Sequence, residues 1–541
     1  MGVQDGRSEP PVAWRPSLPI GAQGAVRAAA QIWRQSGSAT AARRMAQGMW
    51  FHDGVLVETA PGAAPWPHAP GTPAWNAYLH SQAWLDDFAA LSRSEPGWAA
   101  LRLVHDWIED FGHGTARGPA WEIQTTARRQ IHWLAHRDML AEAATPREKA
   151  AFEAVLHRQR RHIALWWWRA LRGLPRLETL AAMLFSRLEM RGYGSVKTVI
   201  RRLGREAFHV LGDLDAVVGR NPERLMRLVD LLSLMEEALR ERGYTADTRH
   251  LAALGHLAPM LGALTHSDGR LGRFHGAPAG KAGDAEAVLA RLERPEELPR
   301  LALGCARLTS GDASLLMDAS AGGDFASALA IEFVAGAHPI LVNAGGGASF
   351  GPDAIAEARR TRSHSTVVIG GESHALNPAG DPARLIRIGF DRDAAANWLV
   401  GDSDAWRKSH GLAHRRRLRL AHDGRFLEGE DVFKAATDAD CRLFDQARGS
   451  HYRAVDYQIR FLLHPDVRYR TTKRWDEVFL RLPDDSIWRL RVKGGSLSLR
   501  PGLYYDSARL HPLSTKTVVA SGEIVEYGSR ITWSLEAQSA L

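Results

Sequence analysis

The chain has 541 residues, of which 45% are hydrophobic and 24% are charged. This composition is ordinary for a globular protein and excludes wholesale disorder, while the length exceeds the roughly 250–300 residues that one hydrophobic core supports. We therefore expect two large domains. The net charge of +8 is suited to an anionic partner, whether nucleic acid, acidic polysaccharide or lipid, without choosing among them; a basic surface that only keeps the protein soluble is the equal alternative.

Tryptophan is concentrated near the start of the chain: 13 of the 18 lie between Trp14 and Trp168. Most should pack between helices, because each ring buries a large apolar area. Two cysteines, Cys305 and Cys441, are too few for a disulfide framework. The first residues lack the apolar stretch of a signal peptide and no run is long enough to span a bilayer. We expect a cytoplasmic protein, with a periplasmic location as the alternative.

Helical periodicity dominates from about residue 24 to residue 290. Apolar residues recur at three- and four-residue steps in four clear segments: Ala150–Leu171, Leu174–Leu188, Asn221–Leu239 and His250–Leu264. About ten helices joined by short loops predict antiparallel hairpins, stacked as a solenoid or as a closed ring. The lack of a fixed-period repeat weighs against a regular solenoid.

After about residue 300 the period changes to two, which predicts strands. The first expected strands are Ser314–Asp318, Ala328–Val334, Ile340–Asn343 and Ser365–Ile369. Two hairpins follow around turn-forming residues, Arg415–Leu420 with Phe426–Val432 and Glu477–Leu482 with Ile487–Val492. Many short strands at this spacing predict an antiparallel β-sandwich. The Ala-, Gly- and Pro-rich segment Gly276–Pro299 is the expected linker, so the predicted domains are 1–295 and 300–541.

Several strings resemble the heparinase II/III-like family of polysaccharide lyases. In the second half they are Phe333–Asn343 (FVAGAHPILVN), Arg360–Val368 (RTRSHSTVV), Gly411–Leu418 (GLAHRRRL) and Phe461–Pro465 (FLLHP). In the first half they are Trp121–Trp133 (WEIQTTARRQIHW), Arg220–Leu225 (RNPERL) and His266–Ala277 (HSDGRLGRFHGA). The resemblance implies an incomplete α/α toroid followed by an antiparallel β-sandwich, with a groove for a polyanion between them.

The resemblance also implies β-elimination on a uronate-containing glycan. This reaction needs donors that neutralise the sugar carboxylate, a base for the C5 proton and an acid for the leaving oxygen. The family is expected to use an Asn-His pair in the toroid, a Tyr, and a His from the sandwich. The expected helix, Trp168–Thr179, contains neither Asn nor His. We therefore predict an altered site, with Tyr193 and His275 as the catalytic candidates; a loop anchor is the alternative role of Tyr193.

The remaining candidates concern binding and metal. The predicted substrate contacts are Trp121, Arg220, Asn221, Arg273 and Arg362, with Trp133 as a second ring for stacking on sugar. The resemblance implies a structural zinc ion held by His364, Asp381 and His414, a donor set that suits zinc. Asp391 and Asp393 are alternatives to Asp381, and both histidines could be ordinary strand residues. No organic cofactor is expected.

The alternating Arg415, Arg417 and Arg419 share one strand face, which could clamp sulfates or carboxylates or simply face solvent. Without a recognised nucleic-acid motif, the expected partner is an anionic polysaccharide or oligosaccharide. The predicted function is a lyase acting on an acidic glycan. The alternative is a noncatalytic binder of an anionic glycan or an envelope precursor. Both a monomer and a homodimer stay open.

Overall fold

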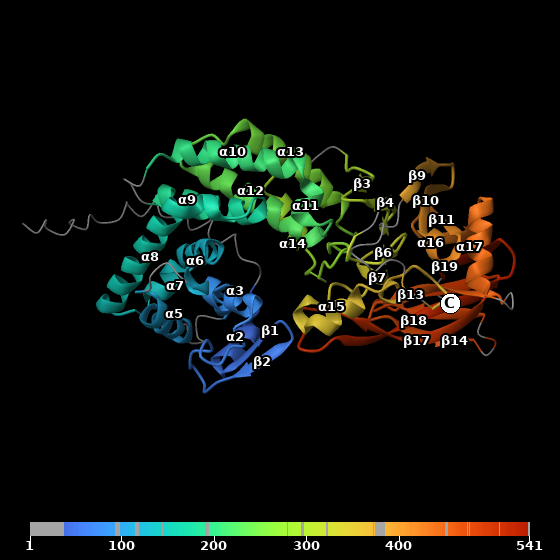
Figure 1. The fold of residues 1–541 in the computed structure, drawn as a ribbon, viewed down its shortest axis with the longest axis horizontal. Coiled ribbons are helices and arrows are strands. Elements are labelled where there is room, and N and C mark those ends of the chain that lie inside the picture. The colour runs from blue at the N-terminus through green and yellow to red at the C-terminus, as the bar shows by residue number, and fades with distance from the viewer. Residues whose placement is uncertain are drawn as a thin grey trace, which may run out of the picture.

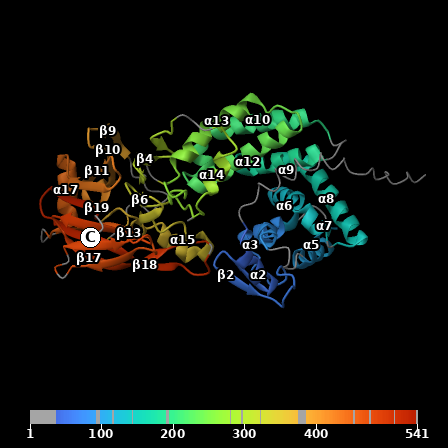
Figure 2. The same ribbon diagram turned by 180° about the vertical axis from the view of Figure 1, so that it is seen from behind.

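The computed structural model describes residues 37–91, 98–113, 118–142, 144–189, 194–278, 280–293, 297–320, 323–371, 373, 385–449, 453–472, 474, 476–507 and 509–538. A curved array of helices occupies one end of the molecule and packed sheets occupy the other (Figure 1). The view from behind shows the same division, with α15 between the two ends (Figure 2). The expected order, an α/α toroid followed by an antiparallel β-sandwich, is confirmed.

The helical part contains α2 to α14. Their bounds are α2 Ala39–Ala46, α3 Pro73–Ser81, α4 Leu85–Ala89, α5 Trp98–Phe111, α6 Ile123–Ala135, α7 Arg137–Glu142, α8 Pro146–Trp166, α9 Leu174–Glu189, α10 Val196–Gly212, α11 Leu214–Val218, α12 Pro222–Glu241, α13 Thr248–Ala263 and α14 Asp284–Leu289. Local sequence determines where several of these helices begin. Thr145 and Glu148 form a capping box before α8, and the Asn221 side chain accepts two backbone N–H groups before Pro222 opens α12.

The toroid has an inner and an outer row of helices. Helices α3, α6, α9 and α12 contact one another in that order and form the inner row, while α8, α10 and α13 pack outside them. The helical part also contains a hairpin of β1 (Met49–His52) and β2 (Val55–Glu58). The helical periodicity did not predict this hairpin. Its turn is the Asp53-Gly54 pair, in which both residues have positive φ.

The sandwich consists of two antiparallel sheets. Their strands are β3 Leu301–Ala302, β4 Cys305–Ser310, β5 Ala313–Asp318, β6 Ile331–Ala335, β7 His338–Val342, β8 Val367–Ile369, β9 Leu385–Arg392, β10 Ala396–Trp406, β11 Leu412–Ala421, β12 Phe426–Lys434, β13 Val455–Leu463, β14 Arg468–Thr471, β15 Glu477–Arg481, β16 Ile487–Lys493, β17 Ser496–Tyr504, β18 Leu513–Ile524 and β19 Gly528–Ala537. One sheet has the order β14-β15-β16-β19-β12-β11-β10-β9, and the other β17-β18-β13-β7-β6-β5-β4-β3, with β8 beside β13. Both predicted hairpins are present, as β11–β12 and β15–β16.

Three short helices interrupt the sandwich: α15 Pro352–Ala358, α16 Arg407–His410 and α17 Asp438–Arg448. The two sheets enclose their own apolar core. The toroid core does not stop at the last helix, because it continues into Leu303, Cys305, Leu316 and Ala330 of the second part. The two halves therefore share buried apolar surface. Among the described residues, no helix combines the length and apolar character that a bilayer span requires.

One arginine joins the halves through its backbone and its side chain. Arg273 is buried, and its guanidinium donates to the carbonyls of Ala344 (2.7 Å) and Tyr505 (2.9 Å). The same group lies over the Tyr504 ring, 3.6 Å from its centroid. Its backbone N–H donates to Glu332 Oε2 at 2.8 Å. A residue predicted to contact substrate thus lies in the junction between toroid and sandwich.

Candidate functional site in the helical toroid

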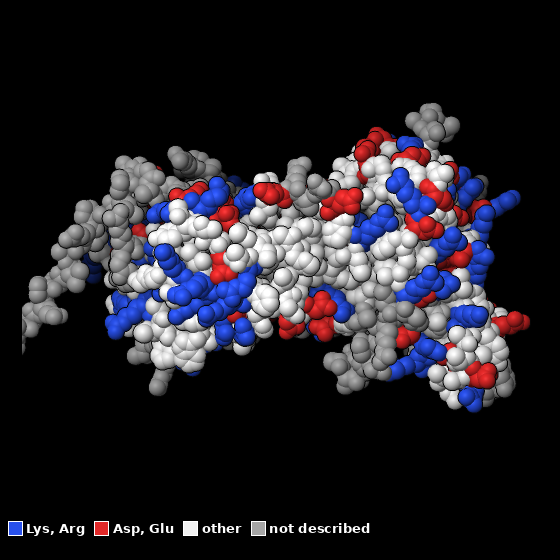
Figure 3. All heavy atoms as spheres, turned by 90° about the horizontal axis from the view of Figure 1, so that it is seen from above, with Lys and Arg blue, Asp and Glu red and all other residues white. Residues whose placement is uncertain are grey.

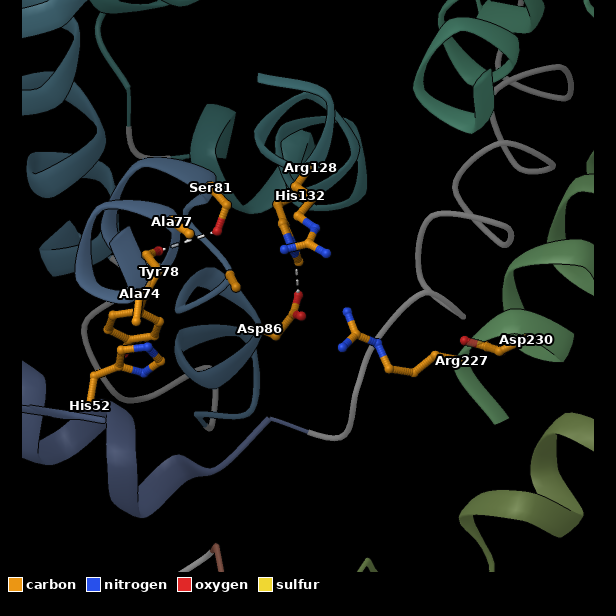
Figure 4. A pocket seen from close by; sticks show the side chains of 11 residues that line it. His52, Ala74, Ala77, Tyr78, Ser81, Asp86, Arg128, His132, Arg227 and Asp230 are labelled. Atoms are coloured by element: carbon orange, nitrogen blue, oxygen red, sulfur yellow. Dashed lines mark hydrogen bonds and ion pairs between the residues drawn. The ribbon is translucent and has the colours of Figure 1, made fainter. Parts of the chain in front are cut away.

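A cavity of about 340 Å³ opens on the inner side of the toroid. Its walls come from β1, α3, α4, α6 and α12, segments that are far apart in the sequence (Figure 4). The lining residues are His52, Ala74, Ala77, Tyr78, Ser81, Ala83, Asp86, Arg128, His132, Arg227 and Asp230. A volume in this range is suited to a small ligand or one or two sugar rings.

Two arginines give one wall a positive charge. Arg128 of α6 donates to both oxygens of Glu178 on α9, at 2.8 and 3.0 Å. Arg227 of α12 approaches the same carboxylate at 3.6 Å. The Glu178 side chain is 1% exposed, whereas those of Arg128 and Arg227 are 29% and 33% exposed. Arg128 and Arg227 make this one wall locally positive, which is suited to a carboxylate or sulfate, while Asp86 and Asp230 bring negative charge to other parts of the lining.

A histidine and a tyrosine lie against each other at another wall. The rings of His52 and Tyr78 are stacked with their centroids 4.2 Å apart. Burial lowers the pKa of His52, so this imidazole stays neutral and able to accept a proton near pH 7. Burial raises the pKa of Tyr78 far above its usual value. The Tyr78 hydroxyl is thus held protonated and is no base at neutral pH.

Asp86, His132 and His136 form a compact cluster beside the cavity. Asp86 Oδ1 lies 2.7 Å from His136 Nε2 and 3.3 Å from His132 Nδ1. The two rings lower the pKa of Asp86 to about 2, against the opposing effect of burial. Asp86 and His132 line the cavity, and Figure 4 shows them facing each other. Among the described residues, this is the group of three potential ligands whose donor atoms all lie within 4.8 Å of one another.

The predicted residues Asn221 and His275 meet at the junction instead of the cavity. The Asn221 amide donates to the His275 carbonyl at 3.0 Å while its oxygen caps α12. The His275 ring is buried, with Nε2 at 3.3 Å from Asp318 Oδ2 and 3.2 Å from Ser320 Oγ. His275 and His364 both contact the Phe325 ring edge-on, at centroid distances of 6.4 and 6.3 Å. The structure therefore brings His275 near the sandwich, as a neighbour of His364.

Three further predicted contacts have protein partners. Trp121 is 6% exposed and its indole N–H donates to the Phe111 carbonyl at 2.9 Å, so the ring packs in the core and does not line the cavity. Arg220 lies 3.4 Å from Asp215. Arg362 is held by both oxygens of Glu357, at 2.7 and 2.5 Å. The cavity is not lined by any of these three side chains.

The histidines predicted to bind zinc are buried in the sandwich. His414 Nε2 lies 2.7 Å from Asp431 Oδ1, and burial lowers the pKa of the ring. Asp431 also accepts two hydrogen bonds from Arg416, which is fully buried. The carboxylate partner of His414 in the structure is thus Asp431. Tyr193 and Asp381 lie outside the described residues, so the catalytic role of the first and the zinc set that includes the second stay predictions.

Sequence reasoning missed the cavity residues. The spacing His132-x-x-x-His136 was a usable signal, because residues four apart share a helix face and this spacing recurs in metal sites. Gln124, Arg128 and His132 likewise follow one face of α6. Asp86 could not have been found from spacing, since it lies 46 residues before His132 and meets it only in the folded toroid.

The chain is similar to known proteins in its sequence family and in its fold. Residues 296–534 match the family model described as heparinase II/III-like, C-terminal. The fold resembles a crystal structure of heparinase III with a TM-score of 0.66 at 11% identity, over 99% of this chain and 88% of that one. It also resembles a heparan sulfate lyase mutant of Pedobacter heparinus, with a TM-score of 0.59 at 13% identity, over 98% of this chain and 85% of that one. At these identities the structures bear on the fold alone.

The name of one relative found by sequence does not refer to a lyase. FtsZ-localized protein C of Caulobacter vibrioides is 26% identical over 354 residues, which cover 60% of this chain. The match spans 58% of the relative's length. Sequence similarity to that protein is therefore partial on both sides.

Proposed function

This chain is a heparinase II/III-like protein, and on that premise we propose that its toroid cavity binds a uronate residue of an acidic glycan and cleaves the glycan by β-elimination. The observation that carries the proposal is the pair Arg128 and Arg227, which converge on one cavity wall from α6 and α12. Guanidinium groups recognise carboxylates through two parallel hydrogen bonds. The family supplies the substrate class, and the cavity supplies the cationic wall.

The elimination needs a proton acceptor beside the bound sugar. His52 fills this role, because burial keeps its imidazole neutral and it lines the same cavity as the two arginines. The base removes the C5 proton, the C4–O bond breaks, a C4=C5 double bond forms and the leaving oxygen takes up a proton from solvent water. Neutralising the carboxylate stabilises the negative charge that develops at C5. Tyr78, held protonated, packs against the base.

Absorbance of the unsaturated product tests this function across a panel of uronate polymers. We expect Arg227→Gln to weaken glycan binding by about 10–100-fold, the equivalent of one charge-assisted hydrogen bond. His52→Gln should abolish product formation while binding persists. Arg201→Gln is the matched control, because Arg201 is exposed on α10 and does not line the cavity. Equal losses in Arg227→Gln and Arg201→Gln would refute the assigned cavity.

The relative named FtsZ-localized protein C favours a second candidate, a noncatalytic protein that binds an anionic glycan or envelope precursor where FtsZ is localized. A protonated Tyr78 in the cavity agrees with lost elimination chemistry. In this case no polymer yields an unsaturated product, one of them still binds, and the chain co-sediments with FtsZ polymers. Product formation without co-sedimentation would exclude this candidate.

A further inference from the structure

We propose that Asp86, His132 and His136 bind one divalent transition-metal ion, with Zn²⁺ as the best fit, at the wall of the toroid cavity. His132 lies in the last turn of α6 and His136 caps this helix, so their spacing of four residues turns both rings to one side. Asp86 reaches them from the first turn of α4. Each side chain is at least nine-tenths buried, which fixes the three donor atoms in place.

The donor atoms lie within 4.8 Å of one another, and the two separations that involve Asp86 can be compared with those of a tetrahedral ion. Ligand atoms about 2.05 Å from Zn²⁺ lie roughly 3.4 Å from one another. Asp86 Oδ1 and His132 Nδ1 are already 3.3 Å apart. Asp86 Oδ1 and His136 Nε2 are 2.7 Å apart and must separate by roughly 0.7 Å, which a small side-chain rotation supplies.

The chemistry of the donors selects the type of ion. Two imidazoles and one carboxylate suit Zn²⁺, and sites with three protein ligands keep a fourth position for water or substrate. Asp86 and His132 line the cavity, whereas the His136 side chain is 1% exposed, so the fourth position faces the cavity. The positive charge of Arg128 is compensated by Glu178 and leaves the carboxylate of Asp86 to the ion.

The position of the ion at the cavity wall gives it a role in binding the sugar, and this role alone rests on the proposed function. An ion facing the cavity would bind the sugar carboxylate as a Lewis acid and supplement Arg128 and Arg227. Ion binding itself does not depend on that function. A hydrogen-bonded cluster in which Asp86 only orients the two histidines is the competing interpretation, and it predicts no bound metal.

Metal content of the full chain separates the two interpretations. Protein stripped with a chelator is titrated with Zn²⁺, and with Co²⁺ to record the visible spectrum of a four-coordinate site. We expect Asp86→Asn and His132→Gln each to lose about one equivalent of metal and the Co²⁺ spectrum. His250→Gln is the matched control, because it changes a buried toroid histidine that bonds to the Leu232 carbonyl and lies outside the three-residue cluster. It should keep this equivalent.

Unchanged metal content in both toroid variants, or no tight binding by the parent chain, overturns the proposal. X-ray absorption on the Zn²⁺-loaded parent chain gives a second readout that needs no variant, and ligation by two histidines and one carboxylate is expected. Sulfur ligation or an oxygen-only shell contradicts the site. Arg227→Gln separates this proposal from the proposed function, because it should weaken glycan binding and retain the metal.

Discussion

Single carboxylates inside the toroid carry much of its response to pH. Glu189 ends α9, and its Oε2 lies 4.0 Å from Arg137 Nη1. Burial raises the pKa of Glu189 from its usual 4.5 to about 7, although Arg137 and Arg160 act in the opposite direction. The folded state therefore favours the protonated acid. Its contribution to stability is complete below pH 4.5 and is lost as the pH rises through 7.

Glu189→Gln should remove this loss. The free energy of unfolding of the parent chain falls between about pH 4.5 and 7, while the variant stays level in that window and is more stable at pH 8 by on the order of 2 kcal/mol. Urea unfolding at several pH values measures both. A variant that is less stable than the parent chain at pH 8 would contradict this prediction.

At the scale of elements, the tryptophans of the helical part differ in how deeply their rings are buried. Trp133 on α6 is fully buried, stacks on Phe152 at 4.5 Å and donates to Gln82 at 2.7 Å. Trp168, in the short turn after α8, is 56% exposed. We expect Trp133→Ala to cost about 3–5 kcal/mol and Trp168→Ala less than about 0.5 kcal/mol. Chemical denaturation of both variants tests this contrast, and similar losses would contradict it.

Sequence periodicity was most informative where one element buries one face. It predicted α9, α12 and the hairpins β11–β12 and β15–β16 because a regular apolar spacing or a turn-forming pair marks each of them. The hairpin β1–β2 was missed although Asp53-Gly54 marks its turn, since each of its strands has only four residues. Such short strands bury few apolar side chains, so the sequence shows no regular alternation of apolar and polar residues.

The same limit applies to the candidate site. Asp86, His132 and Arg227 belong to α4, α6 and α12 and meet only because the inner helices of the toroid are adjacent. Their contact depends on the curvature of the whole array, which no local pattern encodes. The resemblance implied the toroid and the sandwich, but it directed the expected contacts to the junction, where Arg273 and His275 contact the sandwich and Asn221 bonds to His275.

At the scale of the whole molecule, charge and junction act together. The face seen from above shows a cluster of Lys and Arg over part of the helical half, with Asp and Glu within and beside it, and both signs mix over the sandwich (Figure 3). The two halves should respond as one unit, because they share a core and the buried contacts of Arg273.

Calorimetry tests this coupling. The parent chain should unfold in a single transition, and Arg273→Ala should lower its stability by about 3 kcal/mol, since two hydrogen bonds from a charged group and a ring contact are lost. Arg273→Lys, which keeps the charge and loses the planar donor pair, should fall between the two. Two separate transitions in the parent chain would refute the coupling.

The shared core also has a consequence for synthesis. Residues of the toroid leave the ribosome first, yet the core that they form also contains Ala302, Leu303, Cys305, Leu316 and Ala330. A nascent chain that ends before these residues has an open edge on its helical array. Completion of the toroid must therefore wait until the first strands of the sandwich have emerged, so translation and folding of the two halves overlap in time.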